Sequence, residues 1–339
     1  MKRIGILAFL ASFLVAVSGA FHGAFSQEVI NWKLQCYFQT PQSLGYMNEF
    51  IDKVKEKTKG RLLIKGYSAD QLVKTMGVLD AVAGGAIEMG WGTGIYHEGK
   101  IPEAGIEFGL PFSWETWAEQ KEVYQKYGLL QKVREAYADK GLYFISPHPA
   151  GPYLLMTKKR IDGLDDLRGM KLRAPGMEAK ILAALGASTV GMPGVEQYMA
   201  LQRGTIDGTI YVTLALKAMK LHEVVDYVYY PGFIKPTTDL YANLKAWNSL
   251  SPDLQKAVQE AIDEILDKMD QGYDSEDALG LMRSLMDGGL KGAIRFSDAD
   301  VARLRETAMK VWDELAAKSP RCKEMVDIVK KFMKDKGKI

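Results

Sequence analysis

The chain has 339 residues, of which 47% are apolar and 25% are charged, and its 44 basic and 42 acidic residues give a formal net charge of +2. A charge this close to balance argues against nucleic acid or an anionic membrane surface as partner, because both are bound through an excess of basic residues. The length is sufficient for two domains with their own cores.

The first 26 residues have the layout of a secretory signal peptide. Lys2 and Arg3 precede an uncharged apolar run over 4–17, small residues follow, and no acidic residue occurs in the segment. This order is typical of export signals, and the run is too short for a comfortable transmembrane helix. We expect cleavage near Ser26, with Ala20 as the alternative, and a soluble periplasmic protein with 42 basic and 42 acidic residues.

Helices and strands alternate along the next part of the chain. Short apolar runs predict strands at 31–38, 61–67 and 87–90, with helices between them marked by apolar residues at helical spacing. A helix over 116–139 and a strand at 142–146 follow a loop rich in glycine and aromatic residues. Such alternation predicts a parallel-type sheet covered by helices.

The same alternation starts again after a proline-rich crossover at 147–152. The expected strands lie at 153–158, 170–173, 188–190 and 206–210, and the expected helices at 177–185 and 195–202. This restart indicates two similar lobes. The chain first crosses from one lobe to the other at 147–152.

The last third of the chain contains one unusually long helical pattern. A strand at 239–244 precedes Ser251-Pro252, an N-cap followed by proline at the first helical position. The pattern then continues towards Met286, long enough to run across both lobes, and a strand at 293–296 and two helices complete the chain. We assign 27–149 and 237–279 to lobe I, and 150–236 and 280–339 to lobe II.

Sequence motifs of enzymes are missing from the chain. It has no Walker-type phosphate loop and no G-x-S-x-G elbow, and its histidines have no metal-ligand spacing. Cys36 and Cys322 are permitted to pair in an oxidising compartment, but two isolated cysteines are more often unpaired buried thiols. An exported two-lobe protein of this kind usually captures a small solute in a cleft and closes on it.

Arg173 is the first candidate for contact with such a solute. It ends the expected strand at 170–173, directly before the Pro175-Gly176 break. Ligands of open α/β sheets bind at this edge, and a guanidinium presents a planar fork of donors that matches a carboxylate. A surface arginine is the alternative.

Two segments carry a family resemblance, LDDLRGMKLRAPG over 164–176 and VEQYMALQRGTIDG over 195–208. Together they resemble the solute receptors of tripartite ATP-independent periplasmic (TRAP) transporters, of the dicarboxylate-receptor type. The resemblance implies an α/β fold of the two-lobe periplasmic-binding-protein kind, with a long lobe-spanning helix and a ligand cleft between the lobes. It also implies an organic acid as ligand, membrane subunits as partners and no catalysis, and it makes Arg173 the carboxylate anchor. We expect a monomer without a cofactor.

The residues after Ile206-Asp207-Gly208 separate branches of this family. Relatives that bind 2-oxo acids or lactate together with a metal resemble one another in carrying a Glu-Trp pair at this point. This chain has Ile210 and Tyr211 at the matching positions. An isoleucine side chain has no oxygen to ligate a hard cation, so we predict binding without a metal. The sialic-acid branch uses a second arginine, whose approximate match here is Tyr153.

Aromatic residues are frequent in the loops expected beside the cleft, namely Tyr37, Phe38, Trp91, Tyr96, Phe108, Phe112, Tyr153 and Tyr211. Most are expected to pack in the core; three or four facing the cleft predict a monocarboxylate with an apolar or aromatic body. The candidate ligand-binding residues are Arg173, Tyr211, Tyr153, Trp91, Thr93, Gln39, Phe112 and His148. A sensory receptor on the same fold and, less favoured, an exported enzyme remain alternatives.

Overall fold

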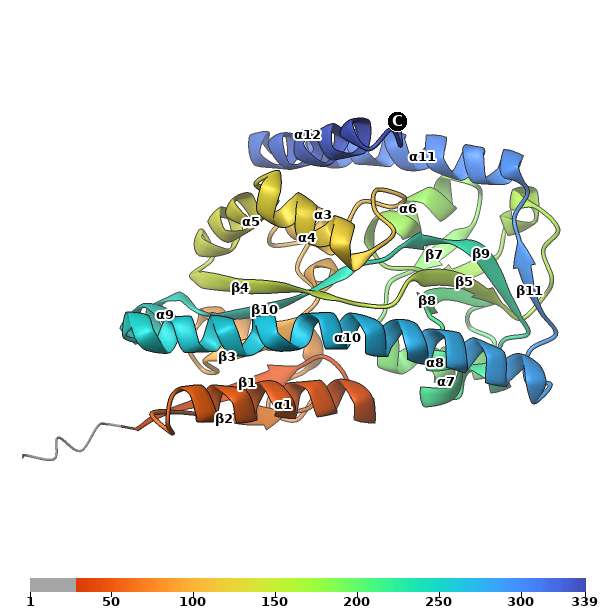
Figure 1. Cartoon of the computed structure of the whole chain (residues 1–339). Helices are drawn as coiled ribbons and strands as arrows, with labels where there is room; N and C mark the ends of the chain where they lie inside the picture. Colours follow the sequence, from red (N-terminus) through yellow and green to blue (C-terminus); the bar gives the residue numbers. More distant parts are fainter. Residues whose placement is uncertain (1–28) are drawn as a thin grey trace, which may run out of the picture.

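The computed structural model describes residues 29–339, so the predicted signal peptide lies outside the described residues. The chain folds into two lobes, each built on one sheet with helices packed against it (Figure 1). The strand order is β2-β1-β3-β10-β4 in lobe I and β11-β9-β5-β8-β6-β7 in lobe II. The predicted two-lobe α/β fold is confirmed.

The sheet of lobe I is mixed rather than purely parallel. Its strands are β1 (Ile30–Cys36), β2 (Leu62–Tyr67), β3 (Met89–Gly92), β4 (Leu142–Pro149) and β10 (Thr237–Asn243). Strand β1 pairs in parallel with β2 and β3, whereas β10 pairs antiparallel with β3 and β4. The antiparallel strand is the one that returns from lobe II. Helices α1 (Pro41–Lys57), α2 (Val78–Ala83) and α3 (Ala104–Phe108) belong to the same lobe.

The single helix predicted over 116–139 is wrong. The structure has two helices, α4 (Trp117–Lys126) and α5 (Leu129–Ala138). Gly128 separates them in the left-handed backbone region, with φ of 88°. This backbone region favours glycine and ends a right-handed helix. The apolar spacing therefore continues through this segment although the helix is interrupted.

Lobe II has the strands β5 (Tyr153–Thr157), β6 (Lys171–Arg173), β7 (Ser188–Val190), β8 (Gly208–Val212), β9 (Tyr227–Ile234) and β11 (Gly292–Arg295). Its short helices are α6 (Gly176–Ala184), α7 (Gln197–Gln202) and α8 (Ala215–Ala218). No strand is expected at 227–234 from the sequence, and β9 contains Pro231, a residue that is unusual in a strand with neighbours on both sides. The register with β5 is irregular there, passing from Tyr229 opposite Leu155 to Ile234 opposite Tyr153, and this irregularity accommodates the proline.

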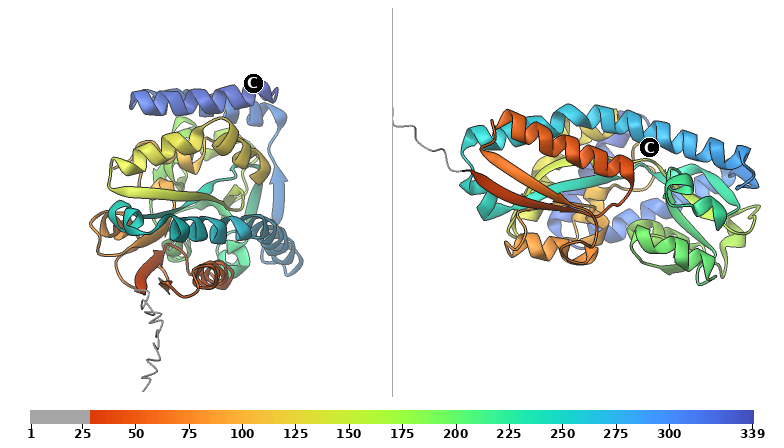
Figure 2. Two further views of the ribbon diagram at one scale, coloured as in Figure 1. Left: turned by 60° about the vertical axis from the view of Figure 1, so that its left-hand side comes forward. Right: turned by 90° about the horizontal axis from the view of Figure 1, so that it is seen from below.

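The lobes are joined at 150–152, at 235–236 and by α10 (Pro252–Met286), which follows the short helix α9 (Leu244–Ser249). Helix α10 has 35 residues and runs the length of the molecule beside both lobes (Figures 1 and 2). A Cβ at Gly272 would lie 1.8 Å from the Tyr46 hydroxyl of lobe I, and one at Gly280 would lie 2.8 Å from the Thr213 carbonyl oxygen of lobe II. Two glycines thus let α10 approach both lobes, which confirms the lobe-spanning helix.

The C-terminal helices form another connection between the lobes. Helix α11 (Asp298–Ala316) packs against α6 of lobe II, whereas α12 (Pro320–Asp335) contacts α3, α4 and α5 of lobe I. The pair Lys132–Glu324, at 2.7 Å, supports this contact. The assignment of 280–339 to lobe II therefore does not describe the packing of α12.

Two further properties concern the described part of the chain. Cys36 and Cys322 are both free and buried, as favoured from their isolation in the sequence. No helix within residues 29–339 combines the length and apolarity needed to cross a membrane.

Candidate functional site

Two neighbouring cavities lie where the lobes meet. They have volumes of about 310 and 60 Å³ and share the lining residues Tyr37, Phe38, Thr40, Tyr211 and Met219. Tyr37, Phe38 and Thr40 follow β1 of lobe I, whereas Tyr211 and Met219 belong to lobe II. The cavities are therefore parts of one interlobe cleft, and its size depends on the separation of the lobes.

Tyrosines from both lobes dominate the walls of the cleft. The ring centroids of Tyr37 and Tyr96 are 6.2 Å apart, and those of Tyr153 and Tyr211 are 5.4 Å apart. The Tyr96 hydroxyl accepts a hydrogen bond of 3.1 Å from the Gly194 amide, which links lobe I to lobe II. Loss of hydration raises the pKa of Tyr37, Tyr153 and Tyr211 above the usual value, so their hydroxyls stay protonated and able to donate.

Arg173 ends β6 with its side chain held in one direction. It is 2% exposed, its Nε and Nη2 donate to the Met192 carbonyl at 3.1 and 3.0 Å, and its Nη1 donates to the Ile210 carbonyl at 2.9 Å. A guanidinium carries five N–H groups, so beyond these bonds within the described chain one hydrogen remains on each terminal nitrogen. Two N–H groups of the guanidinium therefore remain for a ligand.

The ring of Tyr211 lies between Arg173 and the cleft. The guanidinium carbon is 5.2 Å from the ring centroid, and Tyr211 lines both cavities whereas Arg173 lines neither. At this distance the guanidinium makes a cation–π contact with the ring. A shift of this one ring would join Arg173 to the cavities.

The structure brings several other predicted residues to the cleft. Trp91 and Tyr153 line the smaller cavity, and Gln39 lines the larger one. Thr93 is buried near them, and its hydroxyl has no hydrogen-bond partner within residues 29–339.

His148 and Phe112 occupy different positions from the rest of the predicted set. His148 is fully buried against Trp91, with ring centroids 4.6 Å apart, and neither ring nitrogen has a partner in the described chain. Burial lowers the pKa of His148 to about 3, so its imidazole is neutral. Phe112 lines other cavities, with Trp114, Phe233 and Arg305, and the structure does not bring it to the cleft.

Sequence reasoning missed a wall of the cleft that comes from α10. Tyr273 lines the smaller cavity and donates to the Ser43 hydroxyl at 3.2 Å. It lies four residues after Met269, a buried residue of the same helix, so the helical spacing could have indicated it. Thr40, Gly194 and Met219 carry no local signal, because they reach the cleft only through packing of distant segments.

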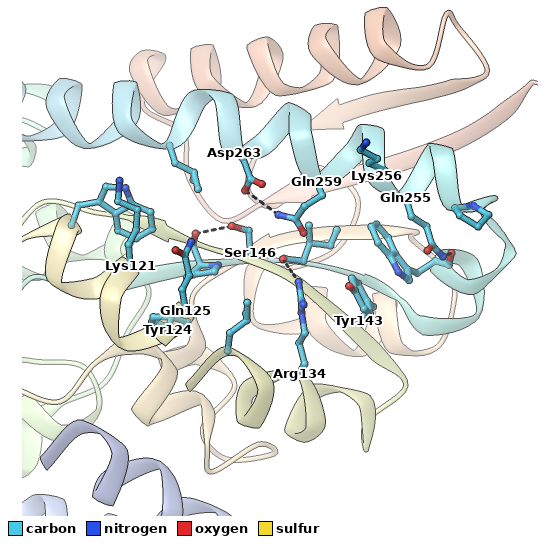
Figure 3. Close-up of a pocket in the computed structure, with 17 residues that line it drawn as sticks. Lys121, Tyr124, Gln125, Arg134, Tyr143, Ser146, Gln255, Lys256, Gln259 and Asp263 are labelled. Carbon is cyan, nitrogen blue, oxygen red and sulfur yellow. Dashed lines mark hydrogen bonds between the residues drawn. The ribbon is translucent and has the colours of Figure 1, made fainter. Parts of the chain in front are cut away.

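A larger cavity than either of those in the cleft lies elsewhere, within lobe I. It measures about 460 Å³ and lies between α4, α5, β4 and the first half of α10 (Figure 3). Arg134 donates to the Phe144 and Ile145 carbonyls at 3.1 Å each, and Asp263 accepts from Gln259 at 3.0 Å. None of the predicted ligand-binding residues lines this outer cavity.

Comparisons with known proteins agree with this organisation. A family model described as bacterial extracellular solute-binding protein, family 7, matches residues 38–319. The chain is 30% identical over 315 residues to a monocarboxylate 2-oxoacid-binding periplasmic protein of Nostoc sp., an alignment that covers 90% of this chain and 84% of the relative.

Two solved structures share the fold at somewhat lower identity. A TRAP periplasmic solute-binding protein of Colwellia psychrerythraea with bound calcium and pyruvate has a TM-score of 0.84 and 26% identity, covering 90% of this chain and 94% of its own. A TRAP solute-binding protein of Bordetella bronchiseptica, with copurified calcium and picolinate, has a TM-score of 0.83 and 25% identity, covering 91% of this chain and 93% of its own.

Proposed function

This chain belongs to family 7 of the bacterial extracellular solute-binding proteins, the periplasmic receptors of TRAP transporters, and we propose that its solute is an aromatic or hydrophobic monocarboxylate bound without a metal ion. Proteins of this family bind solutes and do not transform them, so the chain is a transport receptor and not an enzyme. The membrane subunits of a TRAP system are the partners that the family implies.

The observation that carries the proposal is the buried Arg173 fork behind an aromatic cleft. Tyr37, Tyr96, Tyr153 and Tyr211 supply apolar faces and hydroxyl groups, while Arg173 keeps one hydrogen on each terminal nitrogen. A charge-assisted bidentate pair contributes about 1.5–3 kcal/mol and fixes the orientation of the bound acid. Opening of the lobes would let the Tyr211 ring move aside and admit the carboxylate.

Ile210 supports binding without a metal. Its hydrocarbon side chain is fully buried, and its carbonyl oxygen accepts from Arg173. No group of three or more His, Cys, Asp or Glu side chains within residues 29–339 is arranged to hold a metal ion. Calcium prefers six or more oxygen ligands, which this position does not offer.

A thermal-shift screen tests the proposal. We expect phenylpyruvate and picolinate to raise the melting temperature more than pyruvate does. The shifts should be the same in the presence of EDTA. A ligand present at about 100 times its Kd stabilises the fold by about 2.7 kcal/mol. Arg173→Lys keeps the charge but not the fork, and should weaken all three responses. Stabilisation that appears only with calcium, or only with uncharged solutes, would contradict the proposal.

A further inference from the structure

Glu178 is a buried acid beside the Arg173 anchor with no assigned role. It lies in the first turn of α6, which follows β6 after a two-residue connection, so that the start of the helix adjoins the strand end that carries Arg173. The side chain is 1% exposed, and neither carboxylate oxygen has a hydrogen-bond partner in the described chain. An ionised carboxylate in this state would be costly, because the loss of water outweighs the one nearby backbone donor, the amide of Glu178 itself.

The start of α6, which carries this acid, contacts the opposite lobe. A Cβ on Gly176 would lie 1.9 Å from the Cδ1 atom of Ile95 in lobe I, so the start of α6 touches the opposite lobe directly. The Tyr153 hydroxyl, which belongs to the cleft, feels the charges of both Arg173 and Glu178. Glu178 thus lies within electrostatic reach of Arg173 and of the cleft residue Tyr153.

The charged groups around Glu178 leave it without a cation of its own. Arg173 of β6 lowers the pKa of Glu178, but it directs three of its own N–H groups to main-chain carbonyls. Glu98 of lobe I raises the pKa of Glu178, and Glu98 is itself paired with Lys318 at 2.6 Å. On α11, which packs against α6, Glu314 is paired with Lys180 at 3.3 Å. Burial is the largest effect, and the pKa of Glu178 rises to about 8.

We propose that Glu178 bears a proton and is a second anchor for the ligand, donating a hydrogen bond to the carboxylate that Arg173 binds. This inference rests on the proposed function, because it requires an anionic ligand. With Glu178 neutral, the site carries the single positive charge of Arg173 and suits a monoanion. An ionised Glu178 would cancel that charge and repel the ligand, so binding of the anion and protonation of Glu178 favour each other.

This linkage sets the expected pH dependence. Above its pKa the acid must take up one proton whenever an anion binds, and the affinity then falls by a factor of ten per pH unit. For a pKa of about 8, the affinity for phenylpyruvate should fall roughly tenfold between about pH 7 and about pH 9. Glu178→Gln keeps the size and can donate but cannot titrate, so its affinity should stay constant over this range.

Two measurements on the full mature protein test the inference. Infrared spectra of the ligand-free protein at neutral pH should show protonated-carboxyl absorption from several buried acids, Asp239 and Asp277 among them, and Glu178→Gln should lose one component of it that the control Glu98→Gln keeps. Calorimetric titration with phenylpyruvate should show the tenfold fall in the wild type and a flat profile in Glu178→Gln.

Three results would overturn the inference. The first is unchanged protonated-carboxyl absorption in Glu178→Gln, and the second is the same pH slope in both proteins. The third is tighter binding of phenylalanine than of phenylpyruvate that depends on Glu178. That third result would make the acid an ionised acceptor for an ammonium group. If phenylpyruvate and picolinate fail to bind at every pH, the proposed ligand class is wrong, whereas the infrared comparison still decides whether Glu178 bears the proton.

Discussion

The interlobe cleft and the outer cavity of lobe I differ in a way that volume does not reveal. The outer cavity is larger, about 460 Å³ against about 310 and 60 Å³, but side chains such as Arg134 and Asp263 already bond to neighbouring protein groups. In and beside the cleft, Thr93, His148 and Glu178 are buried without partners in the described chain. The size of a cavity therefore does not by itself identify a ligand site.

The two regions also differ in what holds their walls. Helix α10 borders both, through Gln259 and Asp263 at the outer cavity and Tyr273 in the cleft. The other walls of the outer cavity all belong to lobe I, so the cavity keeps its shape when the lobes move. The cleft has one wall on each lobe and can close on a solute.

The largest expected difference between the regions comes from removing one arginine from each. Arg173→Ala should weaken phenylpyruvate binding by about 10- to 150-fold, the equivalent of about 1.5–3 kcal/mol, because it removes the carboxylate fork. Arg134→Ala should lower the melting temperature, since it breaks two bonds to β4, while the affinity stays unchanged. Calorimetric titration of both variants measures this contrast, and equal losses of affinity would remove it.

A methyl group at the cleft should have the next largest effect. A Cβ on Gly194 would lie 2.5 Å from the Tyr211 hydroxyl, whereas one on Gly191 would meet nothing within 4 Å. Gly194→Ala should therefore displace the Tyr211 ring and weaken phenylpyruvate binding several-fold, and the matched control Gly191→Ala should not. An unaffected Gly194→Ala protein would show that the position of the Tyr211 ring does not limit binding.

Buried acids near the cleft predict how stability depends on pH. Burial raises the pKa to about 7 for Asp239 and Asp277 and about 8 for Glu178, far above the unfolded values near 4. The neutral form is favoured in the fold, so this stabilisation is complete below about pH 4 and is lost as the pH rises through these values. Burial lowers the pKa of His97 and His148 to about 3. Below about pH 6.5 these histidines are protonated in the unfolded chain and neutral in the fold, so they make the stability rise with pH there and oppose the effect of the acids.

The melting temperature of the ligand-free protein should therefore fall by several degrees between about pH 6.5 and about pH 8.5. Asp277→Asn should reduce this fall, because Oδ1 can still accept from the Leu214 amide and the Thr213 hydroxyl while the titrating charge is gone. Melting curves in buffers across this range provide the measurement. A melting temperature that rises with pH would contradict the assignment of neutral buried acids.

The smallest effect is expected at the rim of the outer cavity. Lys121 pairs with Asp267 at 2.6 Å, but both side chains are substantially exposed to solvent. Such pairs contribute at most about 1 kcal/mol, so Lys121→Ala should change neither stability nor affinity by more than that. Denaturant unfolding measures the stability, and a larger loss would show that this cavity is more tightly built than its exposure indicates.

Local patterns predicted some parts of the site and not others. Arg173 could be identified because a strand, a Pro-Gly break and a family motif coincide in one segment. Tyr273 was missed although it continues the apolar stripe of α10, and Phe112 was selected although its loop turns towards Phe233, whose ring centroid is 5.7 Å away. Glu178 could not be distinguished from an ordinary acid in the first turn of a helix, because its burial depends on lobe I.

The sequence by itself determined the export signal layout, the two-lobe alternation and the long helix after Ser251, and it singled out Arg173 as the expected carboxylate contact, since each depends on periodicity, capping or a motif within one segment. Only the tertiary structure decided which side chains face the cleft and which acids lose their water. Those properties arise where residues as distant as Tyr37, Glu178 and Tyr273 pack together, and short-range sequence patterns carry no information on such contacts.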